Sequence, residues 1–374
     1  MMNKVFILSS IACAIWAGTA SGQNQDAPQP AAALKPAQGL KEAYAGKFLI
    51  GAAGDLRGYS EAELANIRAN YNILTPENCL KPQLTHPAEE TFNWGTPDAM
   101  VQWCQDNHLQ VWGHTLVWHA QTGRWFFNPG ADGQAVTREL AMARLKKHIL
   151  TVVGRYRGRL TGWDVVNEAI NDGGNGGTEN LRNSNWYRTI GPDYLTLAFQ
   201  WAHEADPEAQ LYYNDYGIEQ GAAQNRGKHA SSMLLLKRLI QEKAPIHGVG
   251  IQGHWNLNPN LADLEKAIAN YAALGLKVSI SELDVTATGG NSGAFPTRDG
   301  GGAVSDEAFQ RQAQVYGQLF DIFNRHAKSI SRVTFWGLSD RRSWRSWQRP
   351  LLFDGQLQPK PALTAILDAA RGKN

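Results

Sequence analysis

Two glutamates at the ends of apolar runs are the residues whose type and position best fit acid–base chemistry. Glu168 follows the run 162–167, and Glu282 closes the run 277–282. Cleavage of a glycosidic bond needs one carboxyl group that protonates the leaving oxygen and a second that attacks the sugar or activates water. A separation of ~5–5.5 Å between the two groups is typical of retaining enzymes, and one of ~6.5–9.5 Å of inverting enzymes. The plainer alternative is that each glutamate forms a structural ion pair with a nearby Arg or Lys.

The neighbours of the two glutamates favour catalysis over structural pairing. Asn167 directly precedes Glu168, where its amide could hold a sugar 2-hydroxyl, a contact that strengthens in the transition state. Three side chains fall near Glu282 in the order of the runs, where they could hydrogen-bond its carboxylate and keep it ionised: Gln252, His254 and Asp284. Glu168 must keep its proton until it acts, so the two carboxyl groups need different environments.

Polar and aromatic side chains also follow the other apolar runs. Glu77, Asn78 and Lys81 follow the second run. His114 ends the third run, which Trp118 and His119 follow, and Asn214 and Asp215 end the fifth run, which Tyr216 follows. Trp336 lies near the end of the eighth run, which Trp344 follows. So many hydrogen-bonding and aromatic groups at one rim predict a site for a ligand with many hydroxyl groups.

The histidines do not have the spacing of a helical zinc motif. His114 and His119 are five residues apart, and His247 and His254 are seven apart. We therefore expect catalysis without a metal or another cofactor, while a structural Ca²⁺ stays open.

Apolar runs alternate with segments of helical spacing through most of the chain. The runs expected to be buried strands are 48–53, 72–75, 110–114, 162–167, 210–215, 248–253, 277–282 and 333–337. The helix start signals between them are a capping box of Ser60 with Glu63, and first-turn prolines at Pro97 and Pro192. Eight alternations predict an α/β fold, a (β/α)8 TIM barrel with its active site at the carboxyl ends of the strands. An open doubly wound sheet is the alternative, but no Gly-rich phosphate loop follows the first run.

The first 39 residues are interpreted as export and linker sequence. Lys4 precedes an apolar run over 5–17 and small residues within 18–22, a pattern typical of a signal peptide over residues 1–22. The run is shorter than the ~20 apolar residues that a membrane span needs. We therefore expect a secreted or periplasmic protein that is free of the membrane after cleavage. Residues 23–39, rich in Gln, Ala and Pro, predict a flexible lead-in, and residues 40–374 predict a single catalytic domain.

The net charge argues against some classes of partner, and the cysteine count limits the possible disulfides. A formal net charge of +2 over 374 residues gives no field that would recruit nucleic acid or an anionic membrane, so we expect neither as a partner. We expect the chain to act as a monomer. Only Cys79 and Cys104 remain after removal of the signal peptide. Two buried thiols are the preferred interpretation, and a disulfide between them stays open.

The chain resembles glycoside hydrolase family 10, the endo-β-1,4-xylanases, from about Gly51 to Asp354. Seven segments carry the resemblance, in order and each at a predicted strand end: ENCLK (77–81), GHTLVWH (113–119), WDVVNEA (163–169), YNDYGIE (213–219), GVGIQGHW (248–255), SELDV (281–285) and TFWGLSDRRSW (334–344).

The resemblance implies endo-acting, retaining hydrolysis of xylan and xylo-oligosaccharides, with Glu168 as acid/base and Glu282 as nucleophile. Asn167 would hold the 2-hydroxyl of the sugar at the cleavage site. His114, Trp118 and Lys81 would contact that same sugar, Glu77 and Asn78 would contact the next sugar on the glycone side, and Trp336 and Trp344 would form a wall on that side. Gln252 and His254 would support Glu282, with Asp284 behind His254. Tyr216 would offer a stacking face on the leaving-group side.

Two segments depart from the commonest family pattern. The stretch 286–305, which follows the Glu282 strand, is rich in Gly. The run RRSWRSWQRP (341–350) carries four Arg and two Trp, and its plainer interpretation is a rim loop whose Arg side chains are solvated. The sharper hypothesis is that Arg345 or Arg349 pairs with acidic glucuronosyl branches of xylan.

Two other functions stand beside xylan hydrolysis. The same residues could act on another β-1,4-glycan or on aryl cellobiosides, depending on the room beside C5, where glucose carries a CH₂OH group that xylose lacks. A sugar-binding protein without catalysis is the third function, and the presence of both Glu168 and Glu282 argues against it.

Overall fold

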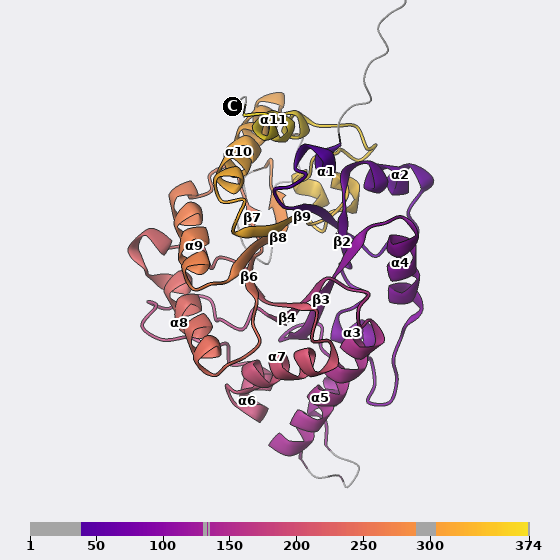
Figure 1. Cartoon of the computed structure of the whole chain (residues 1–374), viewed down its shortest axis with the longest axis vertical. Coiled ribbons are helices and arrows are strands. Elements are labelled where there is room, and N and C mark those ends of the chain that lie inside the picture. The colour runs from indigo at the N-terminus through magenta and orange to yellow at the C-terminus, as the bar shows by residue number, and fades with distance from the viewer. Residues whose placement is uncertain (1–38, 130–132, 134, 289–303, 373–374) are drawn as a thin grey trace, which may run out of the picture. The chain divides into compact units, whose positions relative to one another are not determined.

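Eight parallel strands in the computed structural model close into a barrel, with helices around it (Figure 1). The structure describes residues 39–129, 133, 135–288 and 304–372. The strands of the barrel are β1 (Leu49–Ala53), β2 (Ile73–Thr75), β3 (Gln110–Trp118), β4 (Gly162–Asn167), β5 (Gln210–Asp215), β6 (Gly248–Ile251), β8 (Lys277–Val285) and β9 (Ile330–Phe335). The pairings of β6 with β8 and of β9 with β1 close the ring. The predicted (β/α)8 fold is confirmed, and the open-sheet alternative is wrong.

The helices form the outer layer of Figure 1. They are α1 (Leu40–Ala43), α2 (Glu61–Asn70), α3 (Pro82–Thr85), α4 (Gly95–Asp106), α5 (Arg138–Arg155), α6 (Asn185–Ile190), α7 (Tyr194–Ala205), α8 (Gly227–Gln241), α9 (Leu261–Ala273), α10 (Asp306–Arg325) and α11 (Pro361–Ala370). Short 3₁₀ helices are η1 (Arg124–Phe127), η2 (Ala222–Gln224), η3 (Asp340–Arg342) and η4 (Ser346–Gln348).

Two of the three helix start signals are where the sequence predicts them. Ser60 Oγ accepts a hydrogen bond from the N–H of Glu63, whose carboxylate accepts one from the N–H of Ser60, so the capping box is confirmed. Pro97 lies in the first turn of α4, as predicted. The prediction for Pro192 is wrong, because Gly191 ends α6 with a positive φ of 96° and α7 begins only at Tyr194.

The strands are buried almost throughout, because side chains inside the barrel and helices outside it cover both faces. Because both faces of each strand are buried, the strands are rich in apolar residues and appear in the sequence as apolar runs. β3 continues to Trp118 although the prediction ended it at His114, and a register shift in its pairing with β4 lies between His114 and Val117. The bulged pairing places Trp118 opposite Asn167, at the rim of the barrel. The sixth strand, β6, ends at Ile251, two residues before its predicted end, and a separate two-residue strand, β7 (His254–Trp255), pairs with β8.

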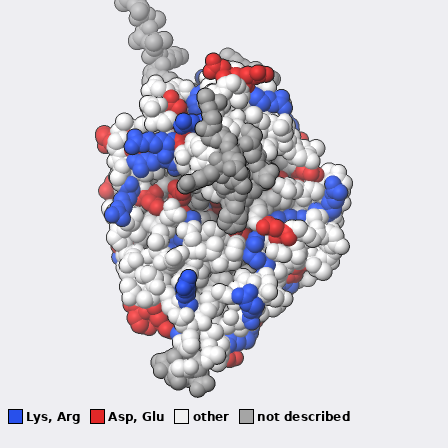
Figure 2. All heavy atoms as spheres, turned by 180° about the vertical axis from the view of Figure 1, so that it is seen from behind, with Lys and Arg blue, Asp and Glu red and all other residues white. Residues whose placement is uncertain are grey.

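Several predictions concern the ends, the thiols and the surface. The predicted signal peptide, nearly all of the lead-in (1–38) and residues 289–303 of the Gly-rich stretch lie outside the described residues. Cys79 and Cys104 are buried free thiols, which confirms the preferred interpretation. Acidic and basic side chains of the described residues are interspersed on the face in Figure 2. Within the described ranges, no helix combines the length and apolar character needed to cross a bilayer.

Candidate active site

A cavity of about 430 Å³ at the carboxyl ends of the strands contains both glutamates. Its lining consists of Glu77, Asn78, Lys81, His114, Trp118, Gln121, Asn167, Glu168, Gln252, His254, Glu282, Trp336, Trp344 and Trp347. The sequence predicts all of these site residues except Gln121 and Trp347. Of the predicted site residues, only Tyr216 and Asp284 lie outside this lining. A larger cavity of about 800 Å³ lies between α10 and α11 and includes none of these residues.

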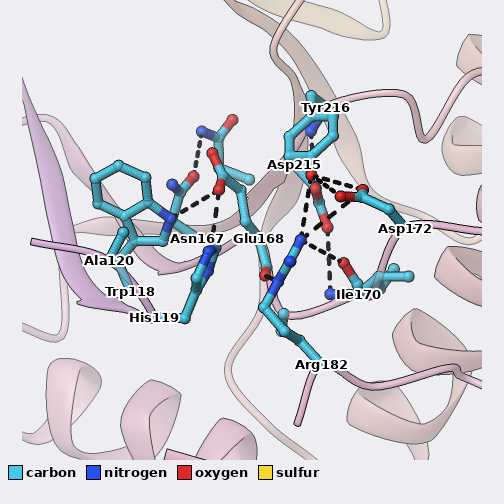
Figure 3. A network of polar contacts seen from close by, with 12 residues as sticks. Trp118, His119, Ala120, Asn167, Glu168, Ile170, Asp172, Arg182, Asp215 and Tyr216 are labelled. Carbon is cyan, nitrogen blue, oxygen red and sulfur yellow. Dashed lines mark hydrogen bonds and ion pairs between the residues drawn. The ribbon is translucent and has the colours of Figure 1, made fainter. Parts of the chain in front are cut away.

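Glu168 is buried just beyond the end of β4, where three neighbours fix its position (Figure 3). Its backbone has a φ of 57°, a left-handed conformation that is uncommon for a residue other than glycine. Trp118 Nε1 donates a 2.8 Å hydrogen bond to its Oε2, and Gln252 Nε2 donates a 2.9 Å bond to its Oε1. Arg182 Nε donates to its backbone carbonyl at 3.1 Å. The carboxyl group is therefore oriented by neutral donors.

The side chain of Gln252 does not hydrogen-bond to the glutamate that the sequence assigns to it. Its side chain donates to Glu168 and, at 3.4 Å, to Asn167 Oδ1, and only its backbone carbonyl accepts from the N–H of Glu282. The prediction placed it by strand order, which puts β6 next to β8. The long side chain instead reaches past β5 to β4, and Asn214 of β5 takes the place beside Glu282.

Glu282 is buried within β8, and hydrogen bonds engage both of its carboxylate oxygens. Asn214 Nδ2 donates to Oε1 at 2.8 Å, and His254 Nε2 lies 3.2 Å from Oε2. The other ring nitrogen of His254 lies 3.0 Å from Asp284 Oδ2. The predicted order, with Asp284 behind His254 and His254 beside Glu282, is present in the structure.

Burial and neighbouring charges shift the pKa values of Glu282 and His254 in opposite directions. Burial alone would raise the pKa of Glu282, but the hydrogen bond from His254 and the nearby His114 outweigh it and hold this pKa below its usual value. Burial alone would lower the pKa of His254, but the charge of Asp284 outweighs it and raises the pKa of His254 to about 9. At neutral pH, His254 is therefore a cation that keeps the Glu282 carboxylate ionised.

Asn167 connects the surroundings of the two glutamates. Its Oδ1 accepts a 2.8 Å hydrogen bond from Asn214 Nδ2 and a 3.4 Å bond from Gln252 Nε2. The same two amides also donate to Glu282 and to Glu168. Since the amide oxygen of Asn167 is engaged inside the protein, its amide nitrogen is the end that can donate to a ligand.

His114 is oriented from inside the barrel. Its Nδ1 lies 3.0 Å from Asp164 Oδ2, and Asp164 Oδ1 accepts from Trp112 Nε1 at 2.9 Å and from Arg332 at 3.3 Å. Because Nδ1 faces Asp164, Nε2 is the ring nitrogen available to a ligand.

On the predicted glycone side, burial has the largest effect on the pKa values of Glu77 and Lys81. Burial raises the pKa of Glu77 to about 7, with Lys81 opposing the shift and Asp55 adding to it. Burial also lowers the pKa of Lys81, whose Nζ donates to Asn78 Oδ1 at 3.1 Å.

Tyr216 lies on the far side of Glu168 from Trp118, outside the cavity (Figure 3). Its hydroxyl donates to Asp172 at 2.6 Å and accepts from Arg182 at 3.2 Å. Lys228 Nζ lies 3.5 Å from the centroid of its ring. One face of the ring is thus covered by a cation.

The position of Arg345 contradicts both hypotheses for its own side chain. Its side chain is fully buried, and Nη1 lies 3.3 Å from Asp284 Oδ1. It is therefore neither solvated nor available to a glucuronosyl branch. The physical reason is the buried carboxylate of Asp284, which needs a cationic partner. Arg349 is exposed, as the plainer interpretation predicts.

Sequence reasoning assigned no role to several residues that contact the predicted set. Asn214 lies at the end of a predicted strand and His119 follows one, which was the only signal for them, and Asp164 lies within a strand. His119 Nδ1 lies 4.0 Å from Glu168 Oε2, and burial lowers the pKa of His119 to about 4, so the ring is neutral near pH 7. Trp347 and Gln121 follow no apolar run closely, and only the folded loops bring them to the cavity.

No cluster of three or more His, Cys, Asp or Glu side chains in the described part of the chain is placed to hold a metal ion.

Comparison with known proteins gives one consistent result. The model of Glycosyl hydrolase family 10 matches residues 39–369. Endo-1,4-beta-xylanase A of Thermoanaerobacterium saccharolyticum is 38% identical over 335 residues, which cover 87% of this chain and 27% of that protein. Beta-1,4-xylanase of Dictyoglomus thermophilum is 38% identical over 341 residues, which cover 88% of this chain and 90% of that protein.

A solved structure agrees with the sequence matches. It is a mutant of TsXylA, an intracellular xylanase of Thermoanaerobacterium saccharolyticum, in complex with xylotriose. It is 37% identical with a TM-score of 0.78, and the match covers 87% of this chain and 97% of that one. The chain spans less than half the length of some curated relatives, between 27% and 47% in three of them.

Proposed function

The chain belongs to glycosyl hydrolase family 10, and from this premise we propose that it is a retaining endo-β-1,4-xylanase. One observation carries the proposal: Glu168 and Glu282 line the same cavity in different electrostatic environments. Neutral donors hold Glu168, whereas the cationic ring of His254 holds Glu282. A proton donor and an ionised nucleophile are the two carboxyl groups that retaining hydrolysis requires.

The reaction would proceed in two displacements. Glu282 attacks the anomeric carbon while Glu168 gives its proton to the glycosidic oxygen, and the bond to the leaving chain breaks with its electron pair on that oxygen. A covalent ester between the sugar and Glu282 results. Glu168, now ionised, takes a proton from a water molecule that attacks the anomeric carbon, and Glu282 leaves as a carboxylate. The amide nitrogen of Asn167 would donate to the 2-hydroxyl in both steps.

Xylan is favoured over other β-1,4-glycans because the relatives described above are named xylanases and one related structure holds xylotriose. Release of reducing ends from xylan and from carboxymethyl-cellulose by the same preparation separates the two substrate classes. We expect at least tenfold faster release from xylan. Faster release from carboxymethyl-cellulose would reverse the assignment.

The stereochemistry of the first product tests the double displacement. Proton NMR of xylohexaose hydrolysis, recorded before mutarotation, should show the β anomer at the new reducing end. An α anomer would mean a single displacement with inversion. Glu282→Ala should lose more than ~10³-fold in turnover. Slow turnover of an activated aryl xylobioside by the unmodified protein, with no loss in Glu282→Ala, would favour a binding protein over an enzyme.

We also propose that the first 22 residues are removed on export and that the mature chain is monomeric. The basic residue, the apolar run of 5–17 and the small residues that follow support export. N-terminal sequencing of the protein from the periplasm or medium should begin after Ala20 or Gly22. Recovery of the full-length chain in the cytoplasm would contradict export, and light scattering would test the monomer.

A further inference from the structure

A third cavity, of about 650 Å³, includes Tyr216, which lies beside Glu168. It is formed by the loop after β4, the loop after β5 and the start of α8, and its lining is Asp172, Gly173, Gly174, Asn175, Tyr216, Gly217, Gln220, Gly221, Arg226, Gly227 and Lys228. Tyr216 connects it to the acid/base, because Arg182 donates both to the Tyr216 hydroxyl and to the Glu168 backbone carbonyl (Figure 3). The family resemblance places Tyr216 on the leaving-group side, so the cavity that Tyr216 lines is assigned to that side.

Two of the three charged residues in the lining are already paired. Lys228 Nζ lies 2.9 Å from Asp215 Oδ1 and 3.3 Å from Asp172 Oδ1, and its side chain is buried. Asp172 also accepts from the Tyr216 hydroxyl at 2.6 Å. Arg182, which does not line the cavity, has Nη2 3.9 Å from Asp172 Oδ1, so Lys228 and Arg182 together offset the charges of Asp172 and Asp215.

Arg226 is the third charged residue and the only one whose charge is not compensated. It is exposed, and its guanidinium makes no hydrogen bond or ion pair with any residue that the structure describes. A guanidinium offers five N–H donors in a planar fork that matches a carboxylate. The rest of the lining suits a sugar ring, because five of the eleven residues are glycines that leave space and Asn175 and Gln220 carry amides.

We propose that this cavity binds a carboxylate-bearing branch of the glucuronosyl class, carried by the xylan chain on the leaving-group side, and that Arg226 pairs with its carboxylate. The proposal rests on the proposed function, since the branch reaches the cavity only when a xylan chain lies across Glu168 and Glu282. It moves the recognition of acidic branches from Arg345, which is buried against Asp284, to an accessible cation in another loop.

The test compares Arg226→Gln, Arg226→Lys and a matched control on two substrates, glucuronoxylan and unbranched xylohexaose. The control is Arg157→Gln, which removes the same charge from an exposed arginine in the loop before β4, at the opposite end of the barrel. We expect the kcat/KM of Arg226→Gln to fall about 3- to 10-fold more on glucuronoxylan than on xylohexaose. Arg226→Lys should recover part of this difference, and 0.5 M salt should reduce it.

Equal losses on the two substrates in Arg226→Gln would overturn the proposal, and so would an equal preference change in Arg157→Gln. Binding separates this proposal from the proposed function. Glu282→Ala and the double variant with Arg226→Gln are titrated with glucuronosylated and unbranched xylo-oligosaccharides. We expect the branched ligand to lose affinity selectively in the double variant. Equal changes for both ligands would overturn the role of Arg226, whereas absence of turnover by the unmodified enzyme would overturn only the proposed function.

Discussion

The indole nitrogen of Trp118 donates a 2.8 Å hydrogen bond to Oε2 of Glu168. The bulged pairing of β3 with β4 makes this contact, because it places Trp118 opposite Asn167, the residue before Glu168. An indole N–H is a neutral donor, so it orients the carboxyl group without adding a positive charge beside it. The charged ring of His254 does the opposite for Glu282. Two identical side chains therefore have the different environments that their two roles require.

We expect Trp118→Phe to reduce kcat/KM about 2- to 10-fold, because a hydrogen bond between neutral groups is worth about 0.5–1.5 kcal/mol. The loss should be larger for aryl xylobiosides with poor leaving groups, which depend on protonation by Glu168. Trp336→Phe is the matched control, since Trp336 lines the cavity without a hydrogen bond to Glu168. A loss in Trp118→Phe that is the same for all leaving groups would show that the indole serves only as a sugar contact.

A pair of amide variants can separate the support of the two glutamates. We expect Gln252→Ala to steepen the dependence of kcat/KM on the pKa of the leaving group, because its side chain contacts Glu168. Asn214→Ala should lower the rate for every leaving group by a similar factor, because Asn214 contacts Glu282. Steady-state kinetics with a series of aryl xylobiosides measures both. The opposite pattern would restore the sequence-based assignment of Gln252 to the nucleophile.

Stability at alkaline pH should depend on His254. Its pKa is about 9 in the folded protein and ~6.5 in an unfolded chain, so the folded state binds the proton more tightly. The stability that this proton contributes is complete below pH 6.5 and is lost as the pH rises toward 9, roughly 3 kcal/mol in total. Urea unfolding at pH 6.5 and 9 should show this loss, and His254→Gln should show a smaller one. Equal losses in the two proteins would mean that another group titrates.

We expect Arg345→Met to lower the free energy of unfolding by about 3–5 kcal/mol, because it leaves Asp284 charged and buried without this partner. Arg349→Met, at an exposed position in the same segment, should change it by less than ~0.5 kcal/mol. Chemical unfolding measures both. Unchanged stability of Arg345→Met, together with a selective loss on glucuronoxylan, would support the original branch-binding hypothesis for Arg345.

Strand positions and the polar residues that end the strands could be predicted from the sequence. Parallel strands covered on both faces appear as apolar runs, and in a barrel their carboxyl ends meet at one rim. Glu168 and Glu282 therefore meet in one cavity although 114 residues separate them. The predicted ends of β3 and β8 were less accurate. Both strands continue beyond the predicted end because the residues that follow stay buried.

The partners of side chains could not be predicted in the same way. Strand order gives the neighbour of a backbone segment, but a long side chain such as Gln252 crosses a strand to reach Glu168. The charge-run rule treats Arg345 as solvated, because the rule contains no information about Asp284, which lies 61 residues earlier in the chain. These contacts depend on the packing of loops, and local sequence patterns do not encode it.

The hydrogen bonds on Asn167 determine which sugars the site can reject. If the Asn167 amide turned by 180°, its NH₂ group would face the NH₂ groups of Asn214 and Gln252, and donor would meet donor. The Asn167 NH₂ group therefore points away from these two residues before any ligand binds. Such a preorganised donor needs no rearrangement during the reaction. It also disfavours binding of a sugar without a 2-hydroxyl, because a 2-deoxy sugar would cover the Asn167 amide and leave its N–H groups without an acceptor. Selection against deoxygenated rings is therefore built into the side chain that precedes the acid/base.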